Sequence, residues 1–454
     1  MGLHERLLER AERREPVTVG VVGAGQMGTG LIVQLVGLAW CDIVGVADVR
    51  LERSIAALES AGVPADQVTV TDDPVAAKRA REAGRCVVTK DAELLANLDA
   101  EDVVVDATGV PEVGARVAHA AIAARKHVVM LNVEADITVG HTLKRLADQA
   151  GVVYTGSAGD EYAATKELVD FANVLGFRII AAGKGKNNPL DRNATPDQLD
   201  ERAKRVGANP WMLCSFVDGT KTAVEMTCLS NATGLVPDVR GMHGPHASLP
   251  ELPKIFCPRE DGGILQHRGV VDYALGVAPG VFVIIEAQHP LIARELEYLQ
   301  LGNGPYWALF RPYHLANLET AMSIARAVVY GEATIAPLPQ PVSETIAIAK
   351  RDLRPGEVLD AIGGYTFYGV IERYSVAAQS GLLPLGLAAG ATLRQAVRKG
   401  EPIPRTAVDI NRTSMLARLR DQQEAAWVAA AAASSGRDWN GSSNRNNQAG
   451  LRSI

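Results

Sequence analysis

The 454-residue chain has few cysteines and no long apolar run. None of its five cysteines belongs to a C-x-x-C pair, which argues against a disulfide framework or a cysteine-based zinc site and favours a reducing compartment. No uninterrupted apolar stretch reaches the roughly 18 residues that a membrane span needs. The first 16 residues form a charged amphipathic pattern without the apolar core of a signal peptide. We therefore expect a cytoplasmic protein without a membrane segment.

An excess of positive charge is also missing, because the formal net charge is −6. A negative net charge does not indicate a protein that binds nucleic acid or a membrane surface. With 47% hydrophobic and 22% charged residues, the composition is that of a soluble globular protein. The expected partner is a small-molecule substrate, and the apolar middle of the chain suggests a homodimer or homotetramer.

Strands and helices alternate over the first third of the chain. Short apolar runs such as "VTVGVV" and "DVVVDATG" are each followed by a stretch with helical periodicity. This alternation predicts an α/β fold with a Rossmann-type doubly wound parallel sheet. We assign residues 1–158 to this dinucleotide-binding domain.

Beyond residue 158 the regular alternation of strands and helices ends, and two regions with different patterns follow. Residues 159–340 mix helices and strands and are expected to form an α+β domain for substrate binding, catalysis and oligomerisation. The proline-rich stretch "APLPQP" leads into residues 341–411, which are predicted to form a small all-β module. Residues 412–454 begin as a helix and end in a polar, glycine-containing tail that we expect to be disordered.

A glycine-rich loop follows the first strand in the sequence Gly23-Ala24-Gly25-Gln26-Met27-Gly28. This G-x-G-x-x-G pattern opens a helix, the context in which it binds a dinucleotide. Gly23 permits the tight turn, Gly25 lets the backbone approach the pyrophosphate, and Gly28 lets the helix pack close to the strand. Unpaired N–H groups at the helix N-terminus, including those of Gln26 and Met27, then favour the anion.

Polar residues follow the later strands of this sheet. Asp48 ends the second strand, where an acid accepts from the ribose hydroxyl of NAD, but Arg50 is placed to hold the 2′-phosphate of NADP. Both NAD and NADP therefore stay open. Ligands of such sheets lie at the carboxyl ends of the strands, so Thr108, Gly109 and Asn132 are expected near the nicotinamide. For Thr108 and Gly109, an ordinary loop without a ligand is the alternative.

The stretch "AGKGKNNP" places two lysines at the end of an apolar strand. Lys184 and Lys186 stand at positions i and i+2, so their side chains point the same way, either into water or toward an anion. In a shared pocket each would disfavour the other's charge, so that one could shuttle protons while the other holds an oxyanion. Asn187 and Asn188 would add directed hydrogen bonds to the substrate.

A second cluster lies in "DGTKTAVEMTCLSNATG". Lys221 and Glu225 stand at i and i+4, so on a helix they share one face. A surface ion pair is the ordinary explanation, but the helix is otherwise too apolar for a solvent face, and its polar groups need partners. We therefore interpret the pair as catalytic, with Asn231 and Thr233 as substrate ligands.

Adjacent acids occur at Asp160 and Glu161. They could hold Mg²⁺ or Mn²⁺ together with a hydroxy-carbonyl substrate, with Asp160 also serving in catalysis and Glu161 in substrate binding. They could equally cap the helix that follows, because acids favour a helix N-terminus.

Several of these motifs together resemble known families. The half containing "VVGAGQMG", "ADVR", "DATG" and "KHVVMLNVEAD" resembles the nucleotide domain of homoserine dehydrogenases. The run "GDE…GKGKNNP…DGTKTAVEM…SNATGL" is similar to deoxyxylulose-phosphate-reductoisomerase-like proteins and to sugar-acid oxidoisomerases. "AKRDLRPGEVL" resembles the SAF type of β-clip domain.

The resemblance implies an NAD(P)-dependent oxidoreductase that couples hydride transfer to the migration of a carbon group in a small hydroxy-carbonyl compound. A simple dehydrogenase and a catalytically inactive nucleotide-binding protein are the alternatives. One departure matters: homoserine dehydrogenases usually have a lysine after the asparagine of "LN", where this chain has Val133. The missing ammonium would then come from Lys184, Lys186 or Lys221.

Overall fold

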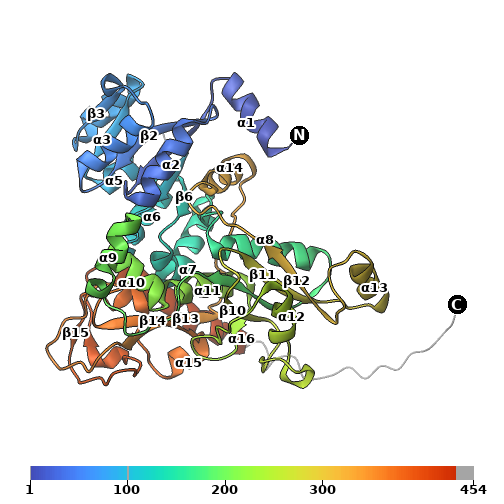
Figure 1. The fold of residues 1–454 in the computed structure, drawn as a ribbon. Coiled ribbons are helices and arrows are strands. Elements are labelled where there is room, and N and C mark those ends of the chain that lie inside the picture. The colour runs from blue at the N-terminus through green and yellow to red at the C-terminus, as the bar shows by residue number, and fades with distance from the viewer. Residues whose placement is uncertain (1, 100–101, 436–454) are drawn as a thin grey trace, which may run out of the picture.

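The structure is a computed structural model that describes residues 2–99 and 102–435, with the side chains of 431–435 excepted. Figure 1 shows an upper lobe built from the N-terminal part of the chain and a broader lower lobe built from the rest. The predicted tail, residues 436–454, lies outside the described residues. No helix within the described ranges combines the length and the apolar character that crossing a membrane requires.

A seven-stranded parallel sheet forms the upper lobe, in the order β3-β4-β2-β1-β5-β6-β7. Its central strands are apolar and buried, as expected of a sheet with helices on both faces. The predicted Rossmann-type α/β fold is thereby confirmed. The strands are β1 (Val17–Val22), β2 (Cys41–Ala47), β3 (Val68–Val70), β4 (Cys86–Thr89), β5 (Val103–Asp106), β6 (His127–Met130) and β7 (Tyr154–Gly156).

Seven helices accompany this sheet in the described sequence. They are α1 (Leu3–Glu12), α2 (Gln26–Val36), α3 (Leu51–Ser60), α4 (Pro74–Glu82), α5 (Ala92–Ala96), α6 (Pro111–Ala123) and α7 (Val133–Ala150). A later helix, α14 (Thr320–Tyr330), returns to the same lobe, where Ile324 and Ala325 join the core around β1. The region assigned to the substrate domain thus supplies part of the nucleotide domain's packing.

A mixed five-stranded sheet forms the middle of the molecule, in the order β12-β11-β8-β10-β9. Its strands are β8 (Arg178–Lys186), β9 (Val236–Pro237), β10 (Val270–Leu275), β11 (Val281–Glu286) and β12 (Tyr306–Arg311). Its helices are α8 (Glu161–Val174), α9 (Pro196–Val206), α10 (Pro210–Val217), α11 (Thr220–Thr233), α12 (Leu252–Ile255) and α13 (Pro290–Tyr298). Nearly every side chain of α11 is buried, so this helix runs through the centre of the lower lobe.

The C-terminal module is built on two small antiparallel pairs, β13–β14 and β15–β16. The expectation of an all-β module is wrong in one respect, because a helix and two 3₁₀ turns lie among these short strands. The elements are β13 (Ser343–Ala349), β14 (Phe367–Arg373), α15 (Tyr374–Gln379), η4 (Leu385–Leu387), β15 (Thr392–Leu393), η5 (Arg405–Ala407) and β16 (Val408–Asp409). The chain then forms α16 (Met415–Ser435), which packs against α6 and α7 of the upper lobe.

Candidate functional site

The glycine loop joins β1 to α2, and its three glycines meet different surroundings. Gly23 has a φ of 98°, a left-handed conformation that glycine adopts without strain. A Cβ on Gly28 would collide with the carbonyl oxygen of Gly23, whereas a Cβ on Gly25 would meet nothing within 4 Å. The backbone at Gly25 is therefore open to a ligand at the N-terminus of α2, which fits the pyrophosphate of a dinucleotide.

Asp48 fastens this loop to the end of β2. One carboxylate oxygen accepts the N–H of Ala24 at 2.8 Å, and the other accepts the N–H of Arg50 at 2.9 Å. Arg50 is exposed beside it. Asp48 and Arg50 thus lie directly after β2, where the adenosine ribose of NAD or NADP is expected.

Asn132 is hydrogen-bonded to the loop that follows β5. It caps α7 and is fully buried, and its amide donates to Asp106 at 3.0 Å, Thr108 at 3.2 Å and the carbonyl of Val110 at 2.9 Å. The interpretation of Asn132 as a coenzyme ligand needs correction, because these internal bonds occupy its amide. It fixes Thr108 instead, next to the exposed Gly109.

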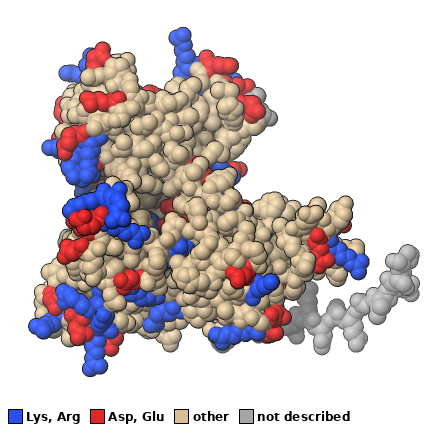
Figure 2. Space-filling model, viewed as in Figure 1, with Lys and Arg blue, Asp and Glu red and all other residues tan. Residues whose placement is uncertain are grey.

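A cavity of about 520 Å³ extends from the start of α2 to the end of β8. Figure 2 shows a hollow between the two lobes, with Lys and Arg side chains gathered beside it over α9. The cavity brings together most of the predicted site residues of the middle domain with two residues of the glycine loop. The predicted residues that line it are Gln26, Met27, Asp160, Glu161, Lys184, Lys186, Asn187, Asn188, Lys221 and Glu225.

Lys184 lies between two carboxylates in this cavity. Its ammonium donates to Glu161 Oε1 at 2.6 Å and pairs with Glu225 Oε2, and only 5% of the residue is exposed. Burial alone would lower the pKa of Lys184, but Glu161 and Glu225 together raise it above its usual value. Lys184 therefore keeps its positive charge at neutral pH.

Lys186 points from the same side of β8 but has a different environment. Its Nζ donates to the carbonyl of Phe216 at 2.5 Å, and no described carboxylate lies within ion-pair distance. Burial and the nearby charge of Lys184 lower the pKa of Lys186 to about 8. Lys186 thus holds a charge that it loses easily and that an anionic ligand would stabilise.

Lys221 reaches the cavity from α11 and pairs with Glu134 Oε1 at 3.3 Å. Burial opposes its charge, but Glu134 and the more distant Asp160 and Glu225 raise the pKa of Lys221 above its usual value. Sequence reasoning missed Glu134. The available signal was its place in the first turn after the strand β6, where side chains meet the carboxyl edge of the sheet.

The remaining acids have strongly shifted pKa values. Burial, with the charges of Glu225 and Glu161 nearby, raises the pKa of Asp160 well above its usual range. Burial and Glu161 raise the pKa of Glu225 to about 7, despite the opposing Lys184. Burial opposes the charge of Glu161, yet Lys184 holds its pKa far below the usual value. Glu225 is therefore poised near neutrality as an acid or base.

The three carboxylates place ligand atoms within 4.8 Å of one another, a spacing that a divalent ion could bridge. However, the ammonium of Lys184 already binds two of the three groups, Glu161 and Glu225. Asp160 also caps α8 through the N–H of Glu161 at 2.9 Å. With Lys184 in place the donor set does not fit Mg²⁺ or Mn²⁺, because a fixed positive charge already pairs with two of its three carboxylates.

Two predicted substrate ligands lie away from the cavity. Asn231 bonds to the backbone of residues 342 and 343, and Thr233 donates to the carbonyl of Leu229 within α11. Both expectations are corrected, since Asn231 faces the C-terminal module and Thr233 bonds to its own helix. The cavity instead gains His314, whose Nδ1 lies 3.1 Å from the carbonyl oxygen of Gly159.

Two protein-family models match the chain. Residues 23–155 match the family described as "Homoserine dehydrogenase, NAD binding domain". Residues 159–320 match the family described as "Oxidoreductase DRL, catalytic domain". Both matches end by residue 320, so the resemblance of residues 341–411 to a SAF domain stays a prediction. None of the curated proteins compared with the chain matches it.

Solved structures give weaker likenesses. A probable dehydrogenase from Thermotoga maritima is 14% identical with a TM-score of 0.40, over 70% of this chain and 90% of that one. The scyllo-inositol dehydrogenase of Lactobacillus casei with NAD(H) is 14% identical with a TM-score of 0.37, over 65% and 76%. Scores this low add nothing to the assignment of an activity.

The two family matches fall on the two halves of the cavity. The NAD-binding match contains the glycine loop and Asp48, and the catalytic-domain match contains the lysines and acids at the other end. The open backbone at Gly25 leaves space at the N-terminus of α2. The chain is an NAD(P)-dependent oxidoreductase.

Proposed function

We propose that the chain is a reductoisomerase or an oxidoisomerase that acts on a small hydroxy-carbonyl substrate, either a sugar phosphate or a branched sugar acid. One observation carries this proposal. Lys184 is buried between Glu161 and Glu225, in the cavity that begins at the glycine loop. A charged lysine next to a carboxylate with a pKa near neutrality is the pair that an α-ketol rearrangement requires.

Glu225 transfers the proton in this reaction, and Lys184 stabilises the developing negative charge. Glu225 in its ionised form takes the proton of the substrate hydroxyl, because burial and Glu161 raise its pKa to about 7. Lys184 keeps its charge and stabilises the oxygen on which negative charge develops. Asp160, whose pKa burial and the nearby Glu225 raise well above its usual range, donates a hydrogen bond to the substrate when it is protonated. The nicotinamide, when bound, supplies or accepts the hydride.

The anionic group of the substrate binds beside Lys186. Lys186 supplies the positive charge, and Asn187 and Asn188 lie beside it at the rim. Arg202 of α9 pairs with the side-chain oxygen of Asn188, which adds a second cation at this rim. Met212 and Phe216 add apolar residues to the cavity lining. This arrangement suits a short polar chain with a phosphate or carboxylate at one end.

The test is a turnover screen of sugar acids and pentulose phosphates with NAD and with NADP, with products identified by ¹³C NMR. A rearranged carbon skeleton supports the proposal. Oxidation or reduction without rearrangement shows a simple dehydrogenase and overturns the isomerase assignment. Lys184→Met should lose turnover while nucleotide binding, followed by NAD(P)H fluorescence, stays intact. Full turnover in that variant would remove Lys184 from the mechanism.

A further inference from the structure

The ion pair between Glu134 and Lys221 joins two helices in the wall of the cavity. Glu134 belongs to the first turn of α7, and Lys221 belongs to the first turn of α11. Their side chains are mostly buried, with 12% and 19% exposed, and the pair is 3.3 Å long. Its geometry therefore depends on how α7 and α11 are held relative to each other.

The hairpin β13–β14 holds α11 at both ends. The N–H of Gly369 in β14 donates to Thr220 Oγ1 at 2.8 Å, at the start of the helix. Near its end, Asn231 Oδ1 accepts the N–H groups of Val342 and Ser343 at 2.9 and 3.0 Å. The C-terminal module thus lies along the back of the helix that carries Lys221 and Glu225.

Helix α16 holds α7 through two buried side chains, Gln423 and Arg420. Gln423, only 1% exposed, donates from Nε2 to the carbonyl of Thr138 at 2.9 Å and accepts at Oε1 the N–H of Thr142 at 2.9 Å. The Thr138 carbonyl and the Thr142 N–H are the acceptor and donor that a regular α-helix pairs with each other, four residues apart. A side chain that bonds both groups ties the geometry of that helical turn to the position of α16.

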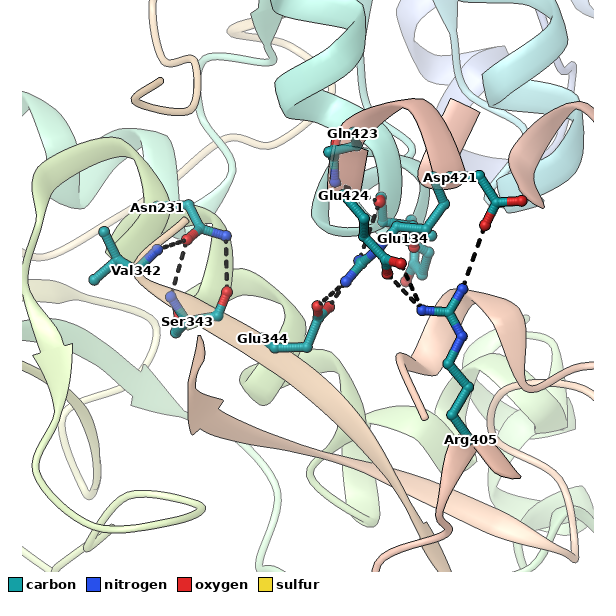
Figure 3. A network of polar contacts seen from close by, with 11 residues as sticks. Glu134, Asn231, Val342, Ser343, Glu344, Arg405, Asp421, Gln423 and Glu424 are labelled. Atoms are coloured by element: carbon teal, nitrogen blue, oxygen red, sulfur yellow. Dashed lines mark hydrogen bonds and ion pairs between the residues drawn. The ribbon is translucent and has the colours of Figure 1, made fainter. Parts of the chain in front are cut away.

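Arg420 links the two halves of this arrangement through Glu344, which is labelled in Figure 3 beside Gln423 and Glu424 of α16. Its guanidinium pairs with Glu344 of β13 and donates from Nη1 to the carbonyl of Thr138 at 3.3 Å. Both charged side chains are buried. The module and α16 therefore meet α7 at Thr138, one turn beyond Glu134, and Thr138 Oγ1 itself donates to the Glu134 carbonyl at 2.7 Å.

We propose that Gln423 is a positioning residue for the catalytic cavity, and that the C-terminal module with α16 is a brace that sets the distance between Glu134 and Lys221. This inference rests on the proposed function of that cavity. Without the amide of Gln423, the turn from Thr138 to Thr142 loses two hydrogen bonds to α16, and the first turn of α7 shifts because these bonds no longer hold it. Glu134 then moves relative to Lys221.

The experiment compares Gln423→Met with Gln422→Met, a neighbouring exposed glutamine on the same helix, in the full-length chain. The rate at which an amine-reactive reagent modifies Lys221 is followed by mass spectrometry. Glu134, Asp160 and Glu225 surround Lys221 and keep it protonated, so withdrawal of Glu134 increases the reactive neutral amine. We expect about a threefold faster modification in Gln423→Met, equal to half a pKa unit, and no change in Gln422→Met. Equal rates in both variants would overturn the proposal.

Turnover provides a second measurement. Gln423→Met should lower kcat with KM for the nucleotide unchanged, and Gln423→Glu, which keeps an acceptor for the Thr142 N–H, should recover part of the loss. If the wild type turns over no substrate of the proposed class, the proposed function fails, but the labelling comparison still decides whether Gln423 positions Glu134. Should Gln423→Met fail to fold, Gln423→Glu replaces it in the labelling, and a wild-type rate there together with a wild-type kcat would overturn the inference.

Discussion

Lys184 and Lys186 stand two residues apart on β8, and their neighbours give them opposite properties. The period of a strand predicts that both amines face one side, and both line the cavity. The sequence could not show that Glu161 and Glu225 neutralise the first lysine, because these partners lie 23 and 41 residues away. Nor could it show that only a backbone carbonyl meets the second.

This contrast predicts opposite stability effects for two identical substitutions. Lys186→Met should raise the thermal unfolding midpoint at pH 7, because a buried charge with no carboxylate partner is removed. The folded-state pKa of about 8 lies below the unfolded value, so the penalty is present below pH 8 and disappears as pH rises toward the unfolded pKa of 10.5. The gain in Lys186→Met should therefore shrink over that window in thermal melts.

Lys184→Met is the matched comparison on the same strand. It leaves Glu161 and Glu225 buried without their cation, which costs about 3–5 kcal/mol of unfolding free energy for a broken buried pair. Denaturant unfolding at pH 7 measures the loss. If Lys184→Met and Lys186→Met change the stability of the protein in the same direction, the different pairing of the two lysines does not determine the effects of these substitutions.

The pH dependence of turnover follows from two groups of the cavity. Activity should rise through about pH 7 as Glu225 ionises to act as a base, and fall above about pH 8 as Lys186 loses the charge that holds the anionic substrate. A kcat/KM profile between pH 5 and 10 measures this, and the two limbs report macroscopic values of a coupled set. In Lys186→Met the alkaline limb should vanish, whereas persistence of the limb would assign it to another group.

At the scale of single elements, the strand β1, its glycine loop and the helix α2 could be predicted in full. An apolar run, three spaced glycines and an acid at the next strand end leave few alternatives. The pattern gave no strand for residues 64–101, where β3 and β4 lie, because runs of three and four residues carry little periodicity. Asn231 was misplaced for a different reason: its partners come from residues more than 100 positions away.

The glycine loop allows a sharp test at this scale. Gly25→Val should abolish nucleotide binding in an NAD(P)H fluorescence titration and leave the melting temperature nearly unchanged, because the space above Gly25 is open to the ligand. Gly28→Val is the matched contrast, since its side chain collides with the Gly23 carbonyl and should destabilise the fold itself. Normal binding in Gly25→Val would place the pyrophosphate elsewhere.

At the scale of the whole molecule, the nucleotide-binding domain is joined to the last described helix, α16. Both carboxylate oxygens of Glu112 in α6 accept backbone N–H groups at the start of α16, from Met415 at 3.0 Å and Leu416 at 2.9 Å. This is a helix cap supplied from about 300 residues away. No sequence pattern could predict it, because capping signals are read from residues adjacent to a helix.

Removing this cap should weaken the contact between α6 and α16. Glu112→Ala is expected to lower the unfolding free energy by about 0.5–2 kcal/mol, the usual range for a lost cap. Urea denaturation measures this, with Glu59→Ala, an exposed acid on α3, as the control. A loss no larger than in the control would mean that α16 docks through its apolar contacts alone.

The distance along the chain between Thr138 and Gln423 has a consequence for biosynthesis. A ribosome completes the segment with Glu134 long before it reaches α16, so the nascent polypeptide can assemble the nucleotide lobe while the wall of the cavity is still unbraced. Catalytic competence would then be acquired late during translation, and a product released prematurely would bind coenzyme without performing efficient chemistry.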